Sequence, residues 1–255
     1  MPGAMSEPRE PSEPERPRIP ILYRDEAVVV VAKPSGLVVH RGWAQDRVVM
    51  MSLVRNQLRR DVYPAHRLDR GTSGALLFAL SPETLRVLND AFEAGRVEKR
   101  YLALVRGRPD PAEGLVDYAI PRTEDGERVP AQTRYHVVHQ LDHYAWVEAF
   151  PLTGRLHQVR RHFKHLRHPI VLDKAHGRGR FNARCQADCG IARMALHAAS
   201  ITFPHPLTGT PVKAVAPLPE DLLTPLRRLG VPDTHLLLDC PSTNHPNVGE
   251  GGAST

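Results

Sequence analysis

The feature that most constrains the fold is a series of apolar runs of strand length. Six such runs predict β-strands, whereas fewer segments have helical periodicity, and these do not alternate regularly with the strands. Because regular alternation is typical of a doubly wound parallel sheet, its absence favours an α+β domain with a mixed, largely antiparallel sheet flanked by helices and loops. The predicted strands are residues 27–32, 74–80, 97–105, 133–139, 144–150 and 194–203.

Four segments predict helices. Ser81-Pro82 supplies an N-cap and a first turn, and Gly95 a stop, for a helix over residues 82–94. Residues 48–58 and 156–166 predict two more. A fourth, over residues 219–229, contains Pro225, which disfavours a helix interior.

The helix predicted over residues 156–166 has apolar residues at spacings of three and four, which form one stripe. At about 100° per residue, its basic residues gather on a neighbouring face, with Arg160 at the border. A half-buried side chain there can direct its guanidinium at an interior carboxylate. The remaining basic residues either contact phosphates or form an ordinary solvated face. They are His157, Arg161 and Lys164.

Composition indicates where the folded part begins and ends. Residues 1–18 hold five prolines, three arginines and four glutamates with almost no apolar residue, which predicts a disordered tail. Residues 240–255 are rich in Gly, Ser, Asn and Pro and predict a second tail. We therefore expect one folded domain over residues 19–239, with too few residues before it for a further RNA-binding domain.

The charge and the cysteines set limits on partners and cofactors. A net charge of +6 points to a polyanion such as nucleic acid. No apolar run is long enough for a membrane span, and the first residues do not resemble a signal peptide, so we expect a cytoplasmic protein. Three cysteines make no disulfide framework, and Cys185 and Cys189 lack a second pair, so no metal site is predicted.

The densest polar segment is HRLDRGTSG, residues 66–74, directly before an apolar strand. Its two glycines allow a tight turn, and Arg67 and Arg70 are expected to keep Asp69 ionised. An ionised carboxylate in such a loop can act as a nucleophile or a base. The alternative is a salt-bridged turn before a strand, so the segment alone does not identify a reaction.

This segment resembles the signature of the RluA-type pseudouridine synthases, a family that modifies ribosomal and transfer RNA. Further segments resemble other motifs of the family in the expected order, over residues 21–217. Several motifs in order are much more specific than any one of them. They are AKPSGLVVH at 32–40, EKRYLALVRG at 98–107, LTGRLHQVR at 152–160, LHA at 196–198 and FPHP at 203–206.

The resemblance implies an isomerase that breaks the bond between uracil N1 and ribose C1′, turns the base and rejoins it through C5, without metal or cofactor. It implies that Asp69 is the essential carboxylate and that Tyr101 stacks on the uracil. It also implies that Arg160 holds Asp69, which we expect as a bidentate pair. Alternatively, Tyr101 is a core aromatic residue, and Arg160 binds phosphate while Arg155 pairs with Asp69.

A base inside folded RNA must leave its stack before it can react. His66 and Arg67 flank the loop and are expected to fill the gap or hold the flipped nucleotide. The basic residues between 160 and 168 are expected to grip the backbone, and Lys33 is either part of the site or an ordinary strand-end lysine. The predicted RNA-binding residues are His66, Arg67, Arg70, Arg155, His157, Arg161 and Lys164.

Finer details resemble the subgroup of the family that modifies uridine 65 of certain tRNAs. These details are the segment HRGW at 40–43, Arg160-Arg161-His162, and His176-Gly177 followed by Asn182. We therefore expect a catalytic-domain-only enzyme that acts on tRNA, as a monomer.

Two residues depart from the expected pattern, and other functions remain open. Leu172 stands where the family usually has glycine before Asp173, and Gly42 stands where the subgroup has serine. The alternatives are the same reaction on large-subunit ribosomal RNA, or a non-catalytic RNA-binding or folding factor. A metal-dependent nuclease would need clustered carboxylates, which these motifs do not offer.

Overall fold

The computed structural model describes residues 18–41, 46, 48–123, 126–177 and 179–238. The predicted tails fall outside these residues, except for Arg18. The described helices are α1 Met50–Leu58, α2 Pro82–Glu93, α3 Gln158–His165, α4 Gly179–Cys189 and α5 Glu220–Arg228, followed by a short 3-10 turn Asp233–His235. The described strands are β1 Ile21–Arg24, β2 Val28–Lys33, β3 Tyr63–Pro64, β4 Ser73–Ala79, β5 Glu98–Arg106, β6 Glu113–Asp117, β7 Ile120–Pro121, β8 Arg128–Val129, β9 Gln132–Gln140, β10 Tyr144–Pro151, β11 Leu196–Pro204 and β12 Pro211–Val215.

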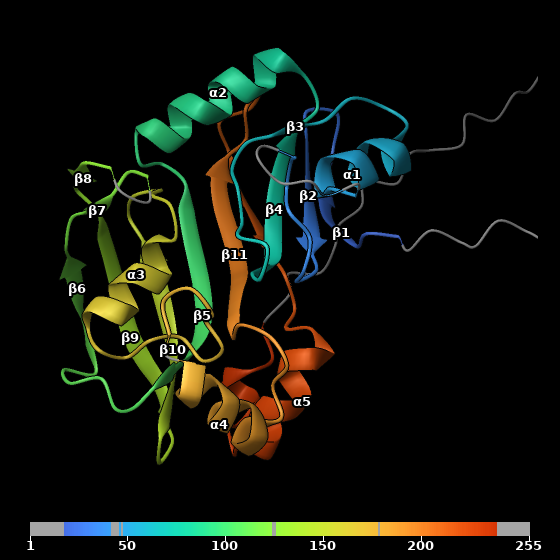
Figure 1. The fold of residues 1–255 in the computed structure, drawn as a ribbon. Coiled ribbons are helices and arrows are strands. Elements are labelled where there is room, and N and C mark those ends of the chain that lie inside the picture. The colour runs from blue at the N-terminus through green and yellow to red at the C-terminus, as the bar shows by residue number, and fades with distance from the viewer. Residues whose placement is uncertain (1–17, 42–45, 47, 124–125, 178, 239–255) are drawn as a thin grey trace, which may run out of the picture.

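Ten strands form one mixed sheet, and β7 and β8 form a separate pair (Figure 1). The order along the sheet is β1-β2-β4-β11-β5-β10-β9-β6, with β12 beside β11 and β3 beside β4. Every pairing in it is antiparallel except that of β4 with β11. The predicted α+β class with a largely antiparallel sheet is confirmed.

The parallel pair β4–β11 is a seam between two contiguous parts of the chain. β1 to β4 come from residues 21–79, and the strands on the other side come from residues 98–215. At the seam Gly74, at φ +120°, faces Ala198, and a Cβ at position 74 would lie 2.1 Å from the Ala198 carbonyl oxygen. Only glycine tolerates this approach. Ser73 Oγ and His197 Nδ1 add a buried hydrogen bond of 2.8 Å across the seam.

The helices cover different ends of the sheet. α2 begins as predicted, because the Ser81 hydroxyl accepts a hydrogen bond of 3.1 Å from the Thr84 amide. It lies at one end of the sheet, and α4 and α5 lie at the other (Figure 1). A large apolar core joins α4 and α5 to β5 and β10, with Trp146 fully buried in it. α5 forms despite Pro225, whereas α4 was not predicted.

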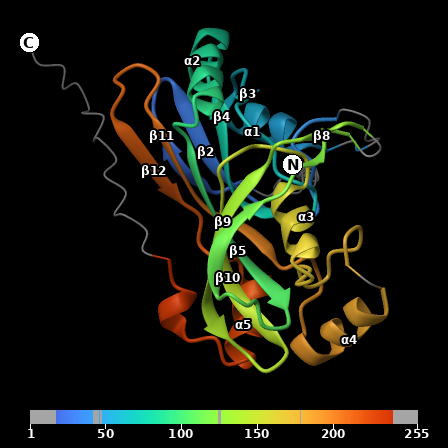
Figure 2. The same ribbon diagram turned by 90° about the vertical axis from the view of Figure 1, so that its left-hand side faces the viewer.

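α3 lies against β9 and β10 (Figure 2). It begins at Gln158, two residues later than predicted, because His157 adopts a left-handed conformation with φ +53°. Leu156 and His157 therefore lie outside the helix, and His157 does not share a helical face with the other basic residues. Val159 and Phe163 are buried as the apolar stripe predicts.

Candidate active site

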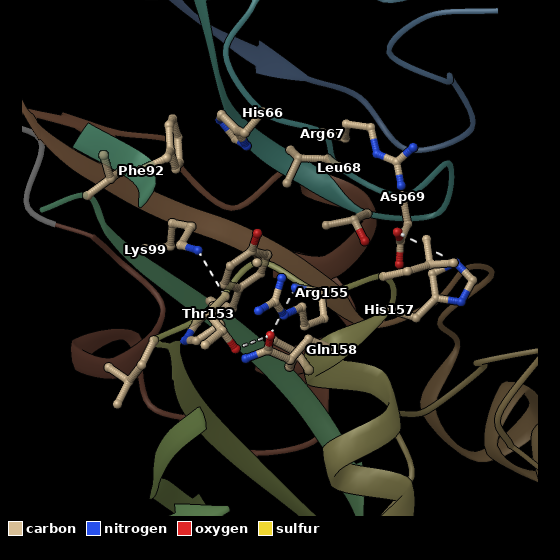
Figure 3. Close-up of a pocket in the computed structure, with 18 of the residues that line it drawn as sticks. His66, Arg67, Leu68, Asp69, Phe92, Lys99, Thr153, Arg155, His157 and Gln158 are labelled. Carbon is tan, nitrogen blue, oxygen red and sulfur yellow. Dashed lines mark hydrogen bonds and ion pairs between the residues drawn. The ribbon is translucent and has the colours of Figure 1, made fainter. Parts of the chain in front are cut away.

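A cavity of about 570 Å³ opens beside the seam and is lined from both sides of it. Asp69 and His157 lie at one end, and Phe92 and Lys99 lie at the other (Figure 3). The segment that follows β10 forms one wall and the loop before β4 forms another. Tyr101 and Arg160 also line it, so the three residues expected to be catalytic share one pocket.

The loop that carries Asp69 is anchored by Lys33, which is only 1% exposed. Its Nζ donates to the carbonyls of Pro34 and Thr72, both at 2.8 Å, and of Arg70 at 3.3 Å. Three acceptors suit an ammonium group with three N–H donors, although burial lowers the pKa of Lys33 to about 7. Of the two interpretations of Lys33, the structure supports a position at the site.

Arg160 connects two carboxylates. Its Nη1 donates to Asp69 Oδ2 at 2.8 Å, and its Nε and Nη2 donate to the two oxygens of Asp173, also at 2.8 Å. The predicted partner of Arg160 is therefore present, but the predicted bidentate geometry is wrong: Asp173 takes the two-pronged contact and Asp69 takes the remaining N–H. Burial opposes the charge on Arg160, yet its hydrogen bonds to both carboxylates raise its pKa.

Asp173 is a residue of the candidate site that the sequence motifs did not indicate. It is fully buried and also accepts from the amides of Ala175 and His176, each at 3.0 Å. Burial would raise its pKa, but Arg160 and the His176 amide lower it, so Asp173 stays ionised. Leu172 before it adopts φ +59°, the left-handed conformation that glycine would allow, and buries its side chain in the core beside α4 and α5.

Tyr101 lies on β5 at the edge of two core clusters and lines the pocket. Burial and the charge of Asp69 raise the pKa of its phenol. The hydroxyl therefore stays protonated at neutral pH. Tyr101 offers the pocket an aromatic ring and an O–H donor, and packs against the core as well.

His157, which the sequence predicted to contact phosphate, lies beside Asp69. Its Nε2 lies 3.7 Å from Asp69 Oδ1, and its Nδ1 lies 3.2 Å from His176 Nε2. Burial lowers the pKa of both rings, that of His176 to about 4. His157 is thus a neighbour of the carboxylate and not a member of an exposed basic face.

Two residues of the HRLDRG segment contribute differently than expected. The His66 ring accepts at Nε2 from the Leu77 amide at 3.1 Å, and burial lowers its pKa to about 3, so it is neutral. Its ring lines the pocket 5.6 Å from that of Phe92. Arg70 turns away to a bidentate pair with Asp46 at 2.6 and 2.7 Å. Arg70 is therefore not the charge that holds Asp69 in place.

The other predicted RNA-binding residues surround the pocket and α3. Arg67 and Arg155 are exposed and line the pocket. Arg155 donates from Nε to the Pro130 carbonyl at 3.3 Å, so it does not replace Arg160 as the partner of Asp69. Arg161 donates to the Pro121 carbonyl at 2.8 Å, while Lys164 is exposed.

No helix in the described part of the chain is long and apolar enough to cross a membrane. In the same residues, no three His, Cys, Asp or Glu side chains gather as a metal site would require, and Cys185 and Cys189 are buried free thiols.

Comparison with known proteins places the chain in a family. Residues 27–165 match the RNA pseudouridylate synthase family. A protein of Salmonella typhi named tRNA pseudouridine synthase C is 38% identical over 82% of this chain and 89% of its own length. A protein of the same name from Pectobacterium carotovorum is 40% identical over 75% of this chain, which spans only 57% of that relative.

Solved structures agree with the sequence comparisons. Human RNA pseudouridylate synthase domain containing 4 superposes with a TM-score of 0.70 and 25% identity, over 83% of this chain and 93% of that one. Human RNA pseudouridylate synthase domain containing 1 gives a TM-score of 0.68 with 27% identity, over 83% and 89%. By sequence and by fold, the chain belongs to the RNA pseudouridylate synthase family.

Proposed function

We propose that this protein is an RNA pseudouridine synthase that converts a specific uridine of tRNA to pseudouridine, without a cofactor. One observation carries the proposal: Arg160 holds Asp69 from one side, at the end of a pocket that Tyr101 also lines. The membership of the chain in the RNA pseudouridylate synthase family supports it. Residues 19–239 are the proposed catalytic domain, acting as a monomer.

The proposed chemistry begins at Asp69. Oδ2 accepts from Arg160, whereas Oδ1 accepts no hydrogen bond from the described residues and lies 3.7 Å from His157 Nε2. Oδ1 is thus the oxygen open to the substrate, and its charge initiates cleavage of the bond between N1 and C1′. Arg160, itself fixed by Asp173, orients the Asp69 carboxylate through a charge-assisted hydrogen bond.

In this proposal Tyr101 contacts the uracil after the base is detached from the ribose. Its ring gives the base a surface to stack on while the base turns. Because its pKa is raised, its hydroxyl acts as a hydrogen-bond donor to a uracil carbonyl rather than as the base that accepts the C5 proton.

The RNA backbone contacts are assigned to the exposed and half-buried basic residues around the pocket. Arg67 and Arg155 stand at the pocket itself, and Arg161 and Lys164 lie on α3. His66 contributes through its neutral ring, and His157 through its position beside Asp69. Arg70 binds RNA only if it leaves Asp46, so we rank it last.

The proposed target is a uridine of the position-65 type in tRNA. The name tRNA pseudouridine synthase C that the relatives carry supports tRNA as the substrate. The position rests on the resemblance of Arg160-Arg161-His162 and His176-Gly177 to the subgroup that modifies uridine 65. The same reaction on large-subunit ribosomal RNA is the second candidate.

Tritium release from RNA labelled at uracil C5 tests the reaction, with Asp69→Asn as the control. We expect release from unmodified tRNA with the wild type only, and pseudouridine mapping of the product then identifies the position. Release from ribosomal RNA alone would correct the substrate. No release from either RNA would leave a non-catalytic RNA-binding factor.

A further inference from the structure

Apart from the His66 ring, the half of the pocket opposite Asp69 has no role in the proposed reaction. Phe92, from the end of α2, and Lys99, from the start of β5, lie there (Figure 3). Val97, Leu152 and the His66 ring complete an apolar lining around the lysine. These aromatic rings, aliphatic groups and the Lys99 cation line the same cavity as the catalytic carboxylate, and the exposed Glu93 at the end of α2 lines it too.

The charge of Lys99 lacks a counterpart in the described protein. Its Nζ donates to one acceptor there, the Thr153 carbonyl at 3.2 Å, and no carboxylate of the described residues forms an ion pair with it. Burial lowers its pKa to about 8, so it is still mostly charged at neutral pH. A partly buried cation without an anion is costly unless a ligand supplies one.

The geometry relates Lys99 to the catalytic end. Lys99 and Tyr101 are two positions apart on β5, so their side chains leave the same face of the strand, about 6.6 Å apart. The charge of Asp69 acts on Tyr101, that of Lys99 acts on His66, and the His66 ring pairs with Phe92. A ligand that starts at Asp69 and reaches Lys99 therefore extends beyond one uracil ring.

We propose that this half of the pocket binds the nucleotide next to the target uridine, with its phosphate on Lys99 and its base against Phe92. The inference rests on the proposed function, because it requires an RNA substrate. Aromatic rings bind unstacked bases through their faces, with little dependence on sequence. The enzyme thus removes two neighbouring nucleotides from the RNA stack and holds them side by side.

The base contact is tested by a double-mutant cycle, which combines a protein variant with a variant of the RNA. The substrate is a synthetic tRNA that supports tritium release, with the base removed from the nucleotide on the 5′ or the 3′ side of the target. We expect one of the two abasic RNAs to bind the wild-type protein about tenfold more weakly than the intact RNA does, because the stacking of that base on Phe92 is lost. Phe92→Leu, which keeps an apolar side chain, should bind the intact and the abasic RNA equally.

The phosphate contact is tested by the salt dependence of affinity. Lys99→Ala should lower the slope of log Kd against log salt by about 0.7, the amount for one phosphate of a single strand, and Lys99→Arg should keep it. Lys213→Ala on β12 and Val87→Ala on α2 are the matched controls, because both side chains are exposed and outside the pocket.

The outcomes separate this inference from the proposed function. If wild type releases tritium but neither flanking base affects binding, or if Phe92→Leu and wild type lose equal affinity for the abasic RNA, the subsite is wrong and the enzyme assignment stands. An unchanged salt slope for Lys99→Ala would remove the phosphate contact. No tritium release by wild type would overturn the function itself.

Discussion

The two ends of the pocket differ in whether their charged side chains are paired within the protein. At the Asp69 end, Arg160 binds two carboxylates, and the buried one, Asp173, also accepts two backbone amides. At the Phe92 end, the one described hydrogen-bond acceptor of Lys99 is a carbonyl. The difference indicates that charges paired within the protein orient a reacting group, whereas an uncompensated charge is available to the substrate.

The same contrast separates the buried Lys33 from the half-buried Lys99. Lys33 donates to three backbone carbonyls and holds the Asp69 loop. Lys99 donates to one and faces the cavity. We therefore assign Lys33 to the architecture of the site and Lys99 to the substrate, and the following experiments test that division.

The largest expected effect is that of Asp69→Asn. We expect turnover to fall by about a thousandfold or more, because the amide cannot supply the charge that starts the reaction, while the Kd for RNA stays within a factor of two or so. Single-turnover tritium release and filter binding measure the two quantities. Asp233→Asn, in a surface ion pair with Arg227, is the control. Normal turnover in Asp69→Asn would remove it from the chemistry.

Asp173→Asn tests whether Asp173 acts by positioning Arg160 and, through it, Asp69. We expect kcat to fall by about 100-fold, because Arg160 loses its two-pronged support and Asp69 shifts. The free energy of unfolding should fall by about 3 kcal/mol, since the variant leaves buried Arg160 partly unpaired. The KM for RNA should change little. A rise in KM with unchanged kcat would instead place Asp173 in RNA binding.

Replacing each lysine with methionine compares them directly. Lys33→Met should lower the free energy of unfolding by about 2 kcal/mol, because three loop carbonyls lose their donor. Lys99→Met should keep or raise it, because an uncompensated charge is removed. Denaturant unfolding at pH 7 measures both. Equal losses would contradict the division between an architectural lysine and a substrate lysine.

The smallest effect is a pH dependence of RNA affinity. The pKa of Lys99 is lowered to about 8, so its charge is present below that pH and is lost as the pH rises through it. We expect affinity to weaken a few-fold between pH 7 and pH 9 in the wild type and to stay level in Lys99→Arg. His66 beside it has a pKa of about 3 and stays neutral throughout. A level wild-type profile would argue against a phosphate on Lys99.

Local signals allowed much of the fold to be predicted from the sequence. The Ser81 cap and Gly95 stop predicted α2 to within one residue of its observed end. α4 was missed because its sequence carries no clear apolar stripe: its buried cysteines contact a core formed by distant strands. Short edge strands such as β1 were missed for a similar reason, since pairing rather than composition creates them.

The sequence predicted which residues form the candidate site, but it predicted fewer of the contacts between them. The motifs identify Asp69, Tyr101 and Arg160 as neighbours, which the shared pocket agrees with. The two-pronged contact of Arg160 with Asp173 depends on the left-handed turn of the chain at Leu172. The direction of the Arg70 side chain depends on its ion pair with Asp46, 24 residues away. Such tertiary pairings have no local signature, so the sequence alone could not assign them.

The seam between β4 and β11 has a consequence for how the enzyme acquires activity. Asp69 precedes the seam on one contiguous part of the chain, while Tyr101 and Arg160 belong to the other. The contacts that join them span 91 residues for Arg160 to Asp69 and 124 for Ser73 to His197. Because contacts so distant along the chain form late, we expect catalytic activity to return only in the slowest phase of refolding, after both halves have their secondary structure.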